Sequence, residues 1–232
     1  MLLDLTMRKS ILKYLIIAIT LFFLVDCKQD DDIVGPSSGP TRKDYYPIQV
    51  GNEWSYDVMI INKNLSTEDT SRYQLKEVLF ELVDSSSRER LYSVYRYKRD
   101  IDLTDWLLDS VWTVVESNDY IIKKENGVNF QKLIFPANEG ASWDGNAWNS
   151  LEALEYNIIG TELTNTINDI VYDETMLVRH YEDVNLISSQ KEYEIYGKGI
   201  GLLEIYRESL ETQPGQNSLG VIYSQKLLEV SF

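Results

Sequence analysis

From residue 45 onward the apolar residues follow a period of two, and this alternation most limits the folds open to the chain. In Trp54–Ile60 every second residue is Trp, Tyr, Val or Ile, which places them on one face of an extended strand. Leu91–Tyr97 and Val111–Val115 are rich in aromatic and β-branched residues, which favour strands. We predict further strands over Tyr120–Ile122, Val128–Phe135, Glu155–Leu163, Asp169–His180, Glu192–Tyr196, Leu202–Glu208 and Gly220–Val230.

The connections between these segments are short and carry turn residues. Asn126-Gly127 joins two of the predicted strands and is a strong signal for a β-hairpin. Because the connections leave no room for helical crossovers, neighbouring strands should pair antiparallel. We therefore predict an all-β fold of about ten strands, either an antiparallel sandwich or a strongly curved, partly open barrel.

Two segments are ambiguous. In Tyr73–Val83 the apolar residues have helical spacing, but the neighbouring segments are strands, so we predict a strand with a bulge near Lys76-Glu77. Asn149–Glu155 is predicted to form a short helix.

The N-terminus has the pattern of a secretory signal peptide. Arg8, Lys9 and Lys13 form a positive region, and the apolar run Leu15–Val25 follows. This run is shorter than the roughly 20 residues that a membrane-spanning helix needs. Its length is typical of the apolar part of a signal peptide.

The run ends in Leu24-Val25-Asp26-Cys27, which resembles the lipobox of bacterial lipoproteins. In that family the signal is cut before the cysteine, which then carries diacylglycerol and usually an acylated amine. The resemblance implies that Cys27 is lipidated and holds the chain to a membrane, since two or more acyl chains give stable anchoring. Asp26 departs from the small residue that the family prefers, which leaves cleavage efficiency open. The alternative is an uncleaved signal anchor with an unmodified cysteine.

The residues after the cysteine carry a second resemblance. Lys28, Gln29, Asp30, Asp31 and Asp32 resemble the short acidic signal that sends Bacteroidetes-type lipoproteins to the outer face of the outer membrane. A solvated acidic tether is the alternative.

Gly-Pro and Ser pairs then mark a flexible linker up to residue 44. The predicted organisation is a signal peptide over 1–26, a lipidated cysteine and linker over 27–44, and one β domain over 45–232. We expect this domain to be anchored to the outer membrane and exposed at the cell surface.

Three stretches of the domain resemble an uncharacterised group of Bacteroidetes-type lipoproteins. They are Tyr45–Tyr56, with an aromatic-Pro step before Gly-Asn-x-Trp-x-Tyr, then Ile134–Asn146, and the Gly-x-Gly-x-Gly-Leu of Tyr196–Leu202. The resemblance implies a similar fold and the same location, but no activity, because the group has no agreed one. The first two stretches place Pro, Gly and Trp in that order, which we interpret as a loop that caps one end of the core.

Several function classes are disfavoured. The formal net charge of −15 repels phosphate backbones, so we expect no nucleic-acid partner. The single cysteine excludes a disulfide framework and a cysteine-rich metal site. The single histidine, His180, is expected on a strand surface or edge without a catalytic role. Gly197–Gly201 precedes a predicted strand, so it indicates a bend and not a phosphate loop. We predict no catalytic residue, metal or cofactor.

Trp143, Asp144, Asn146 and Trp148 form the candidate ligand platform. Two nearby tryptophans can stack on sugar rings, and the polar pair offers oxygen ligands of the kind that Ca²⁺ takes, although no complete calcium loop follows. Burial of both indoles in the core is the alternative.

A second group of candidates is acidic. Asp100, Asp102, Asp105 and Asp109 lie close together in sequence beside Trp106. They form either a solvated loop or the source of a carboxyl pair such as glycosidases use.

The sequence thus predicts a lipid-anchored, non-enzymatic binding or accessory module for a glycan or a protein partner. One alternative is a periplasm-facing carrier whose half-open barrel shelters lipid or lipoprotein acyl chains, which would need an apolar cavity of roughly several hundred Å³. The other alternative is a hydrolase that uses a carboxylate pair.

Overall fold

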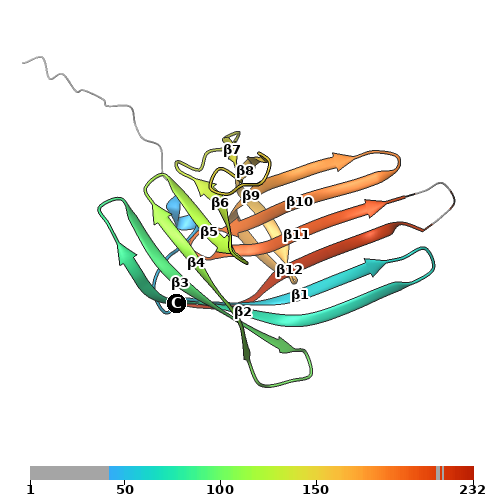
Figure 1. Cartoon of the computed structure of the whole chain (residues 1–232), viewed down its shortest axis with the longest axis horizontal. Coiled ribbons are helices and arrows are strands. Elements are labelled where there is room, and N and C mark those ends of the chain that lie inside the picture. Colours follow the sequence, from blue (N-terminus) through green and yellow to red (C-terminus); the bar gives the residue numbers. More distant parts are fainter. Residues whose placement is uncertain (1–41, 213–214, 216) are drawn as a thin grey trace, which may run out of the picture. The chain divides into compact units, whose positions relative to one another are not determined.

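The computed structural model describes residues 42–212, 215 and 217–232, which form one compact unit. Twelve strands make a single antiparallel sheet in the order β6-β5-β4-β3-β2-β1-β12-β11-β10-β9-β8-β7 (Figure 1). Their bounds are β1 (Glu53–Lys63), β2 (Glu68–Ser85), β3 (Glu89–Asp100), β4 (Leu107–Ser117), β5 (Tyr120–Glu125), β6 (Val128–Ile134), β7 (Ser142–Asp144), β8 (Glu155–Ile167), β9 (Ile170–Val184), β10 (Ser188–Gly197), β11 (Gly201–Glu211) and β12 (Leu219–Ser231).

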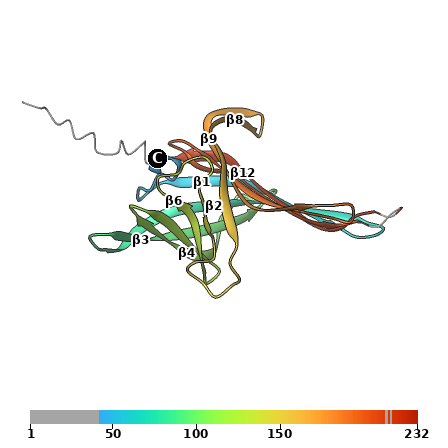
Figure 2. The same ribbon diagram turned by 90° about the horizontal axis from the view of Figure 1, so that it is seen from above.

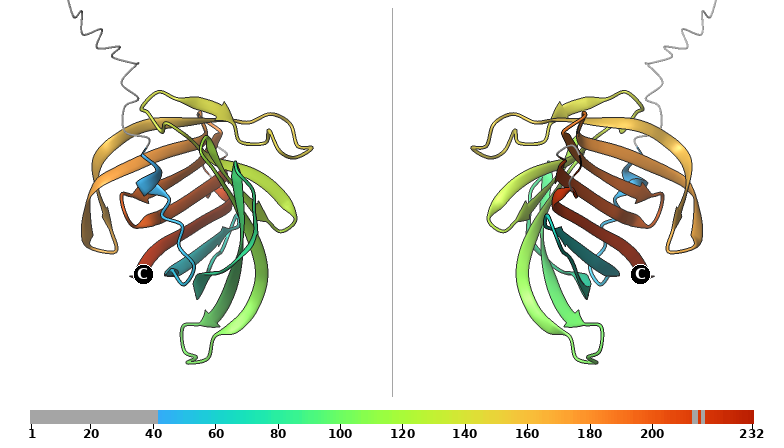
Figure 3. Two further views of the ribbon diagram at one scale, coloured as in Figure 1. Left: turned by 90° about the vertical axis from the view of Figure 1, so that its left-hand side faces the viewer. Right: turned by 90° about the vertical axis from the view of Figure 1, so that its right-hand side faces the viewer.

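The sheet curves into a nearly closed barrel with one unsealed seam, which confirms the predicted all-β class in its barrel form. Figures 2 and 3 show the two ends of the sheet approaching each other, with β5 and β6 on one side and β8 and β9 on the other. Among the described residues no ladder of strand pairing joins β6 to β7. One backbone hydrogen bond, from Gln131 N–H to Gly145 O, crosses the seam at 2.9 Å.

Side chains of β7 and of the loop that follows it, which we call the seam loop, close the rest of the seam. Trp143 donates its indole N–H to the carbonyl of Gln131 at 2.8 Å, and Trp148 donates to the side-chain oxygen of Gln131 at 2.9 Å. The amide of Asn149 donates to the carbonyl of Asn129 at 2.7 Å. The bonds to the carbonyls of Gln131 and Asn129 satisfy edge groups of β6 that a further strand would otherwise satisfy.

Strict alternation along β2 places one set of its residues inside the barrel. Leu75, Glu77 and Leu79 are buried, whereas Phe80 and Leu82 are about half exposed. The strand prediction for this segment is confirmed, but the bulge near Lys76-Glu77 is wrong. The register shifts lie later, between Leu79 and Glu81 and between Leu82 and Asp84, where β2 pairs with β3. Up to Leu79 inward and outward residues alternate without interruption, so the strand needs no earlier bulge.

The turn predictions have mixed outcomes. Asn126 and Gly127 both have positive φ and join β5 to β6, as the hairpin prediction requires. Gly197–Gly201 forms the bend between β10 and β11, also as predicted. The short helix over Asn149–Glu155 is wrong: this segment is a loop of turns, with its backbone held by side chains such as those of Asp144 and Asn149.

Three hairpins continue past the barrel. Figure 1 shows β1–β2, β9–β10 and β11–β12 reaching the same end of the sheet. Backbone and side-chain bonds join their tips, from Thr212 N–H to Ile187 O at 2.8 Å and from the Asn217 amide to Leu65 O at 3.1 Å. The extension is therefore a continuous surface next to the mouth of the barrel.

The described chain begins with residues that already pack on the barrel. A short 3-10 helix, η1 (Lys43–Tyr45), precedes β1, and Tyr45 is 1 % exposed. Arg42 donates to the side-chain oxygen of Asn138 at 2.7 Å. Arg42, Lys43 and Asp44, which the sequence places in the linker, are thus part of the folded unit. None of the helical structure in this part of the chain is long and apolar enough to cross a membrane.

Candidate ligand-binding site

Ionised side chains lie inside the barrel, where apolar residues are expected. Glu77 of β2 is 6 % exposed and accepts hydrogen bonds from Lys123 Nζ at 2.7 Å and Arg96 Nε at 3.0 Å. Burial alone would raise the pKa of Glu77, but the charges and hydrogen bonds of Lys123 and Arg96 together lower it. Both cations also lie over the ring of Trp112, at 3.5 Å for Arg96 and 5.1 Å for Lys123.

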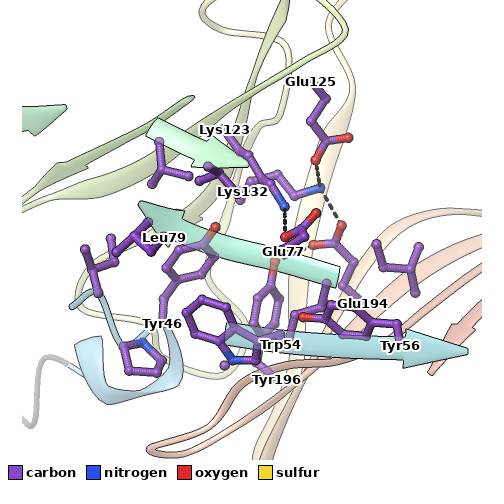
Figure 4. Close-up of a pocket in the computed structure, with 17 residues that line it drawn as sticks. Tyr46, Trp54, Tyr56, Glu77, Leu79, Lys123, Glu125, Lys132, Glu194 and Tyr196 are labelled. Carbon is purple, nitrogen blue, oxygen red and sulfur yellow. Dashed lines mark hydrogen bonds and ion pairs between the residues drawn. The ribbon is translucent and has the colours of Figure 1, made fainter. Parts of the chain in front are cut away.

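A second buried ion pair lies across the lumen, between β6 and β10. Lys132 contacts the carboxylate of Glu194 and lies 3.5 Å from that of Glu125 (Figure 4). Burial would lower the pKa of Lys132, but the two carboxylates raise it. Burial would likewise raise the pKa of Glu194, yet Lys132 and His180 hold it well below its usual range. Glu194 also accepts a hydrogen bond from the hydroxyl of Tyr196.

His180 of β9 links this pair to the barrel mouth. Its side chain is fully buried, with Nδ1 at 3.3 Å from Glu192 Oε1 and Nε2 at 3.5 Å from Glu194 Oε2. The second distance is too long for a strong hydrogen bond. The expectation that His180 lies on a strand surface or edge is therefore wrong. The alternation of β9 points its side chain into the barrel, as it does that of Val178.

Arg207 of β11 is the outermost member of the chain of charges. Its Nε donates to Glu192 Oε1 at 2.7 Å, and its guanidinium lies 5.6 Å from the ring centroid of Tyr223. Burial would raise the pKa of Glu192, but the hydrogen bond from His180 and the charge of Arg207 lower it to about 2. The side chain of Arg207 is 41 % exposed, so the network ends at a solvent-accessible cation.

These contacts form two groups of ion pairs, which we together call the ionic network. One group joins Arg96 and Lys123 to Glu77, and the other joins Lys132 and Arg207 to three carboxylates, with His180 between two of them. The members of the network are Arg96, Lys123, Lys132, Arg207, Glu77, Glu125, Glu192, Glu194 and His180. Each ionised side chain of the network lies beside a group of opposite charge, which is the condition under which such groups tolerate burial.

An enclosed pocket lies on one side of this network. It leaves about 40 Å³ open to the centres of water molecules, room for only a few waters. Figure 4 shows the rings of Tyr46, Trp54, Tyr56 and Tyr196 on the side opposite the lysines. Burial raises the pKa of Tyr46, Tyr56 and Tyr196, so these hydroxyls are held as neutral groups.

An open groove lies on the other side of the network, on the inner face of the β9–β12 extension. Two adjoining depressions of about 530 and 440 Å³ share Leu154, Glu192 and Arg207. We call their union the mouth groove. It is further lined by Glu125, Asn126, Val128, Phe130, Lys132, Asn146, Leu151, Tyr156, Tyr181, Gln190, Lys191, Glu208, Ser209, Val221 and Tyr223. Rings, aliphatic side chains and hydrogen-bonding groups are combined here, and the volume is that of a small-molecule site.

The structure separates the four residues of the predicted ligand platform. Trp143 is 9 % exposed and packs edge-on against Tyr156, whereas Trp148 is 47 % exposed and lies against Tyr120 at 5.3 Å. Asp144 accepts hydrogen bonds from two backbone N–H groups of the seam loop. Asn146 is buried, donates to Glu152 O, and lines the mouth groove.

The acidic candidates lie elsewhere. Asp100, Asp102, Asp105 and Asp109 are exposed on and around the β3–β4 hairpin. Trp106, at this hairpin, lies under Arg99 at 4.4 Å and Lys76 at 5.3 Å. The lipidation residue Cys27 and the export residues 28–32 lie outside the described residues.

The charged residues of the ionic network were missed at the sequence level. The sequence does carry a signal for them. In β5, Lys123 and Glu125 occupy the same alternate, inward-facing positions as Ile121. In β10, Glu192 and Glu194 also occupy alternate, inward-facing positions. Charges of both signs at inward positions of several strands indicate internal ion pairs. The sequence does not say which charges meet, since Lys132 and Glu194 are 62 residues apart.

Comparisons with known proteins give distant likenesses. One is to a "putative exported protein with YmcC-like fold" from Bacteroides fragilis, at 12 % identity and a TM-score of 0.48, covering 81 % of this chain and 98 % of that one. Another is to a "putative lipoprotein" from Parabacteroides distasonis, at 9 % identity and a TM-score of 0.44, with the same coverage of both chains. No protein-family model and no curated protein matches the chain. Both structural likenesses are to Bacteroidetes proteins, and neither carries information on a ligand or a reaction.

Proposed function

We propose that this chain is a lipid-anchored lipoprotein of the cell envelope, displayed at the cell surface, that binds a glycan without chemically changing it. The observation that carries the proposal is the mouth groove, an open site that combines rings, aliphatic side chains and fixed polar groups. Sugars present CH faces and hydroxyls together, so a site for them needs both kinds of lining.

The anchor is part of the proposal. Cys27 would carry the acyl chains, and the residues up to Arg42 would separate the domain from the membrane. Each buried CH₂ of an acyl chain contributes about 0.8 kcal/mol, so two chains hold a protein stably at a bilayer. An anchored domain with an open groove is suited to retaining a ligand at the surface.

The two alternatives have weaker support. A carrier of acyl chains needs an apolar cavity, but the enclosed pocket leaves about 40 Å³ and is lined by five ionised side chains, those of Glu77, Lys123, Glu125, Lys132 and Glu194. A hydrolase built on the acidic segment needs two carboxyls facing each other across a cleft. Asp102, Asp105 and Asp109 are instead exposed on and near a hairpin tip.

The test is binding of the full lipoprotein, purified in detergent, to a polysaccharide and oligosaccharide array. Val221→Arg places a long side chain into the mouth groove and should abolish the binding seen with the unmodified protein. Val171→Arg is the matched control, since Val171 is 61 % exposed and does not line the groove. Absence of glycan binding, or binding that survives Val221→Arg, contradicts the proposal.

A further inference from the structure

We infer that the glycan bound in the mouth groove is acidic, and that Arg207 binds a carboxylate of it. The inference rests on the proposed function and specifies the class of ligand. It follows from the bonding state of one guanidinium and from the charges that surround it.

Arg207 has donors to spare. Its Nε is used by Glu192 at 2.7 Å, and within the described residues its two terminal nitrogens have no hydrogen-bond or ion-pair partner. The side chain lines both depressions of the groove and is 41 % exposed, so the guanidinium group is available to a ligand there. Two parallel N–H donors on a planar group match the two oxygens of a carboxylate.

The guanidinium is also held in place before a ligand arrives. Tyr223 faces it at 5.6 Å, and Glu192 holds its inner edge. Glu192 is itself fixed by His180, whose ring is stacked on Tyr156. A cation that is oriented in advance loses less entropy on binding.

The other cations at the groove are already paired, which leaves Arg207 to bind an anionic ligand. Lys132 is already engaged by Glu194 and Glu125, and Lys191 lies 4.0 Å from Glu208. The three cations and three carboxylates lining the groove, namely Lys132, Lys191, Arg207, Glu125, Glu192 and Glu208, balance to zero. On a chain of net charge −15, this is a place where an anion meets no excess of negative charge.

The neighbours of Arg207 suit the remainder of a sugar acid. Gln190 and Ser209 line the same depression and offer hydrogen-bonding groups for hydroxyls. Leu154, Tyr181 and Val221 supply apolar surface for the CH face of the ring.

The experiment compares acidic glycans with their neutral counterparts. Oligosaccharides of galacturonic, mannuronic and glucuronic acid, and the same molecules with their carboxyls reduced to alcohols, are titrated calorimetrically into the full lipoprotein in detergent. At least one acidic probe should bind, and its reduced form should bind at least tenfold more weakly. This comparison needs no variant, so it does not depend on how a substitution folds.

The variant arm assigns the effect to Arg207. Arg207→Gln should weaken binding of the acidic probe about as much as carboxyl reduction does, and combining the two changes should give little further loss. Arg72→Gln removes the same charge from an exposed position on β2 and should leave binding unchanged. The role of Arg207 is overturned if the losses of affinity from Arg207→Gln and from carboxyl reduction add. It is also overturned if Arg207→Gln weakens binding of the acidic and the reduced probe equally.

The outcomes also separate the inference from the proposed function. If neutral and acidic forms bind equally and Val221→Arg abolishes both, the groove is a glycan site and the inference of an acidic ligand fails. If no acidic or neutral glycan binds, both fail.

Discussion

The ring of Tyr156 lies flat on the imidazole of His180, with centroids 3.7 Å apart and planes 3° from parallel. Tyr156 comes from β8, next to the seam, and His180 from the interior of β9. On its other side Tyr156 meets the backbone of Gly145, whose carbonyl accepts the hydrogen bond from Gln131 N–H across the seam. Closure of the barrel and placement of the buried histidine are therefore coupled through one ring.

This coupling predicts that Gly145→Ala is destabilising. A Cβ on Gly145 would lie 2.4–2.6 Å from the ring of Tyr156, which cannot withdraw because His180 is stacked behind it. Overpacking of this kind costs about 1–3 kcal/mol, measured as the free energy of unfolding in urea. Gly160→Ala is the matched control, since its Cβ would meet only the flexible end of Leu163 at 3.1 Å. Equal losses in the two variants would contradict the tight stack.

Lys132→Met should lower the free energy of unfolding far more than Lys198→Met, its counterpart at an exposed ion pair. It leaves Glu194 and Glu125 without their shared cation inside the barrel, and breaking a buried pair costs about 3–5 kcal/mol. Lys198→Met removes a lysine that pairs with Glu174 at the surface, where solvent screens the pair, so this change should have little effect. Both effects are read from urea unfolding.

Combining Lys132→Met with Glu194→Gln should recover part of the loss, because the carboxylate left unpaired is then removed. A double variant as unstable as Lys132→Met alone would show that packing, and not charge, sets the cost.

Much of the fold could be predicted from alternation because β1, β2 and β8 bury alternate residues and the Asn126-Gly127 hairpin follows local rules. The choice between a sandwich and a barrel could not be made from the sequence, because closure depends on twist summed over twelve strands and on register shifts such as that at Ser55/Tyr56. The loop after β7 was misjudged as a helix for a related reason. Its backbone is organised by hydrogen bonds to a strand that is distant in sequence.

The candidate site was less accessible from sequence. Trp143 and Trp148 are near neighbours along the chain, but the seam turns one indole into the core and leaves the other outside. The mouth groove is assembled from β5, β6, β8–β12 and the seam loop, so none of its chemistry forms a local motif. Arg207 and Glu192 become significant only when β10 and β11 are paired in register.

The buried carboxylates predict a defined loss of stability in acid. Glu77, Glu192 and Glu194 have pKa values below the usual 4.5, about 2 for Glu192. Each contributes stability that is fully present above pH 4.5 and is lost as the pH falls towards 2, because the unfolded chain then binds the proton more readily. Urea unfolding at stepped pH should show this slope.

Glu192→Gln should make the loss of stability with falling pH shallower, since one of the carboxylates with a lowered pKa is removed.

At high pH the tyrosines determine how stability changes. Burial raises the pKa of Tyr193 to about 12, so stability should also fall between pH 10 and 12, as the unfolded chain loses the proton first. A stability that is flat from pH 2 to 5 would contradict the ionic network as described.

Surface display predicts how intact cells respond to protease. If the proposed lipid on Cys27 holds the domain on the outer face of the membrane, the unmodified protein should be digested from outside unbroken cells. Cys27→Ala should move the protein from the membrane to the soluble fraction. Replacing Asp30, Asp31 and Asp32 with Ala should leave the protein anchored but protected, since the export signal is then removed. Lysed cells serve as the control, where all three proteins should be digested alike. Protection of the unmodified protein in intact cells would instead place the groove in the periplasm, and the search for its glycan would have to turn to the inner side of the membrane.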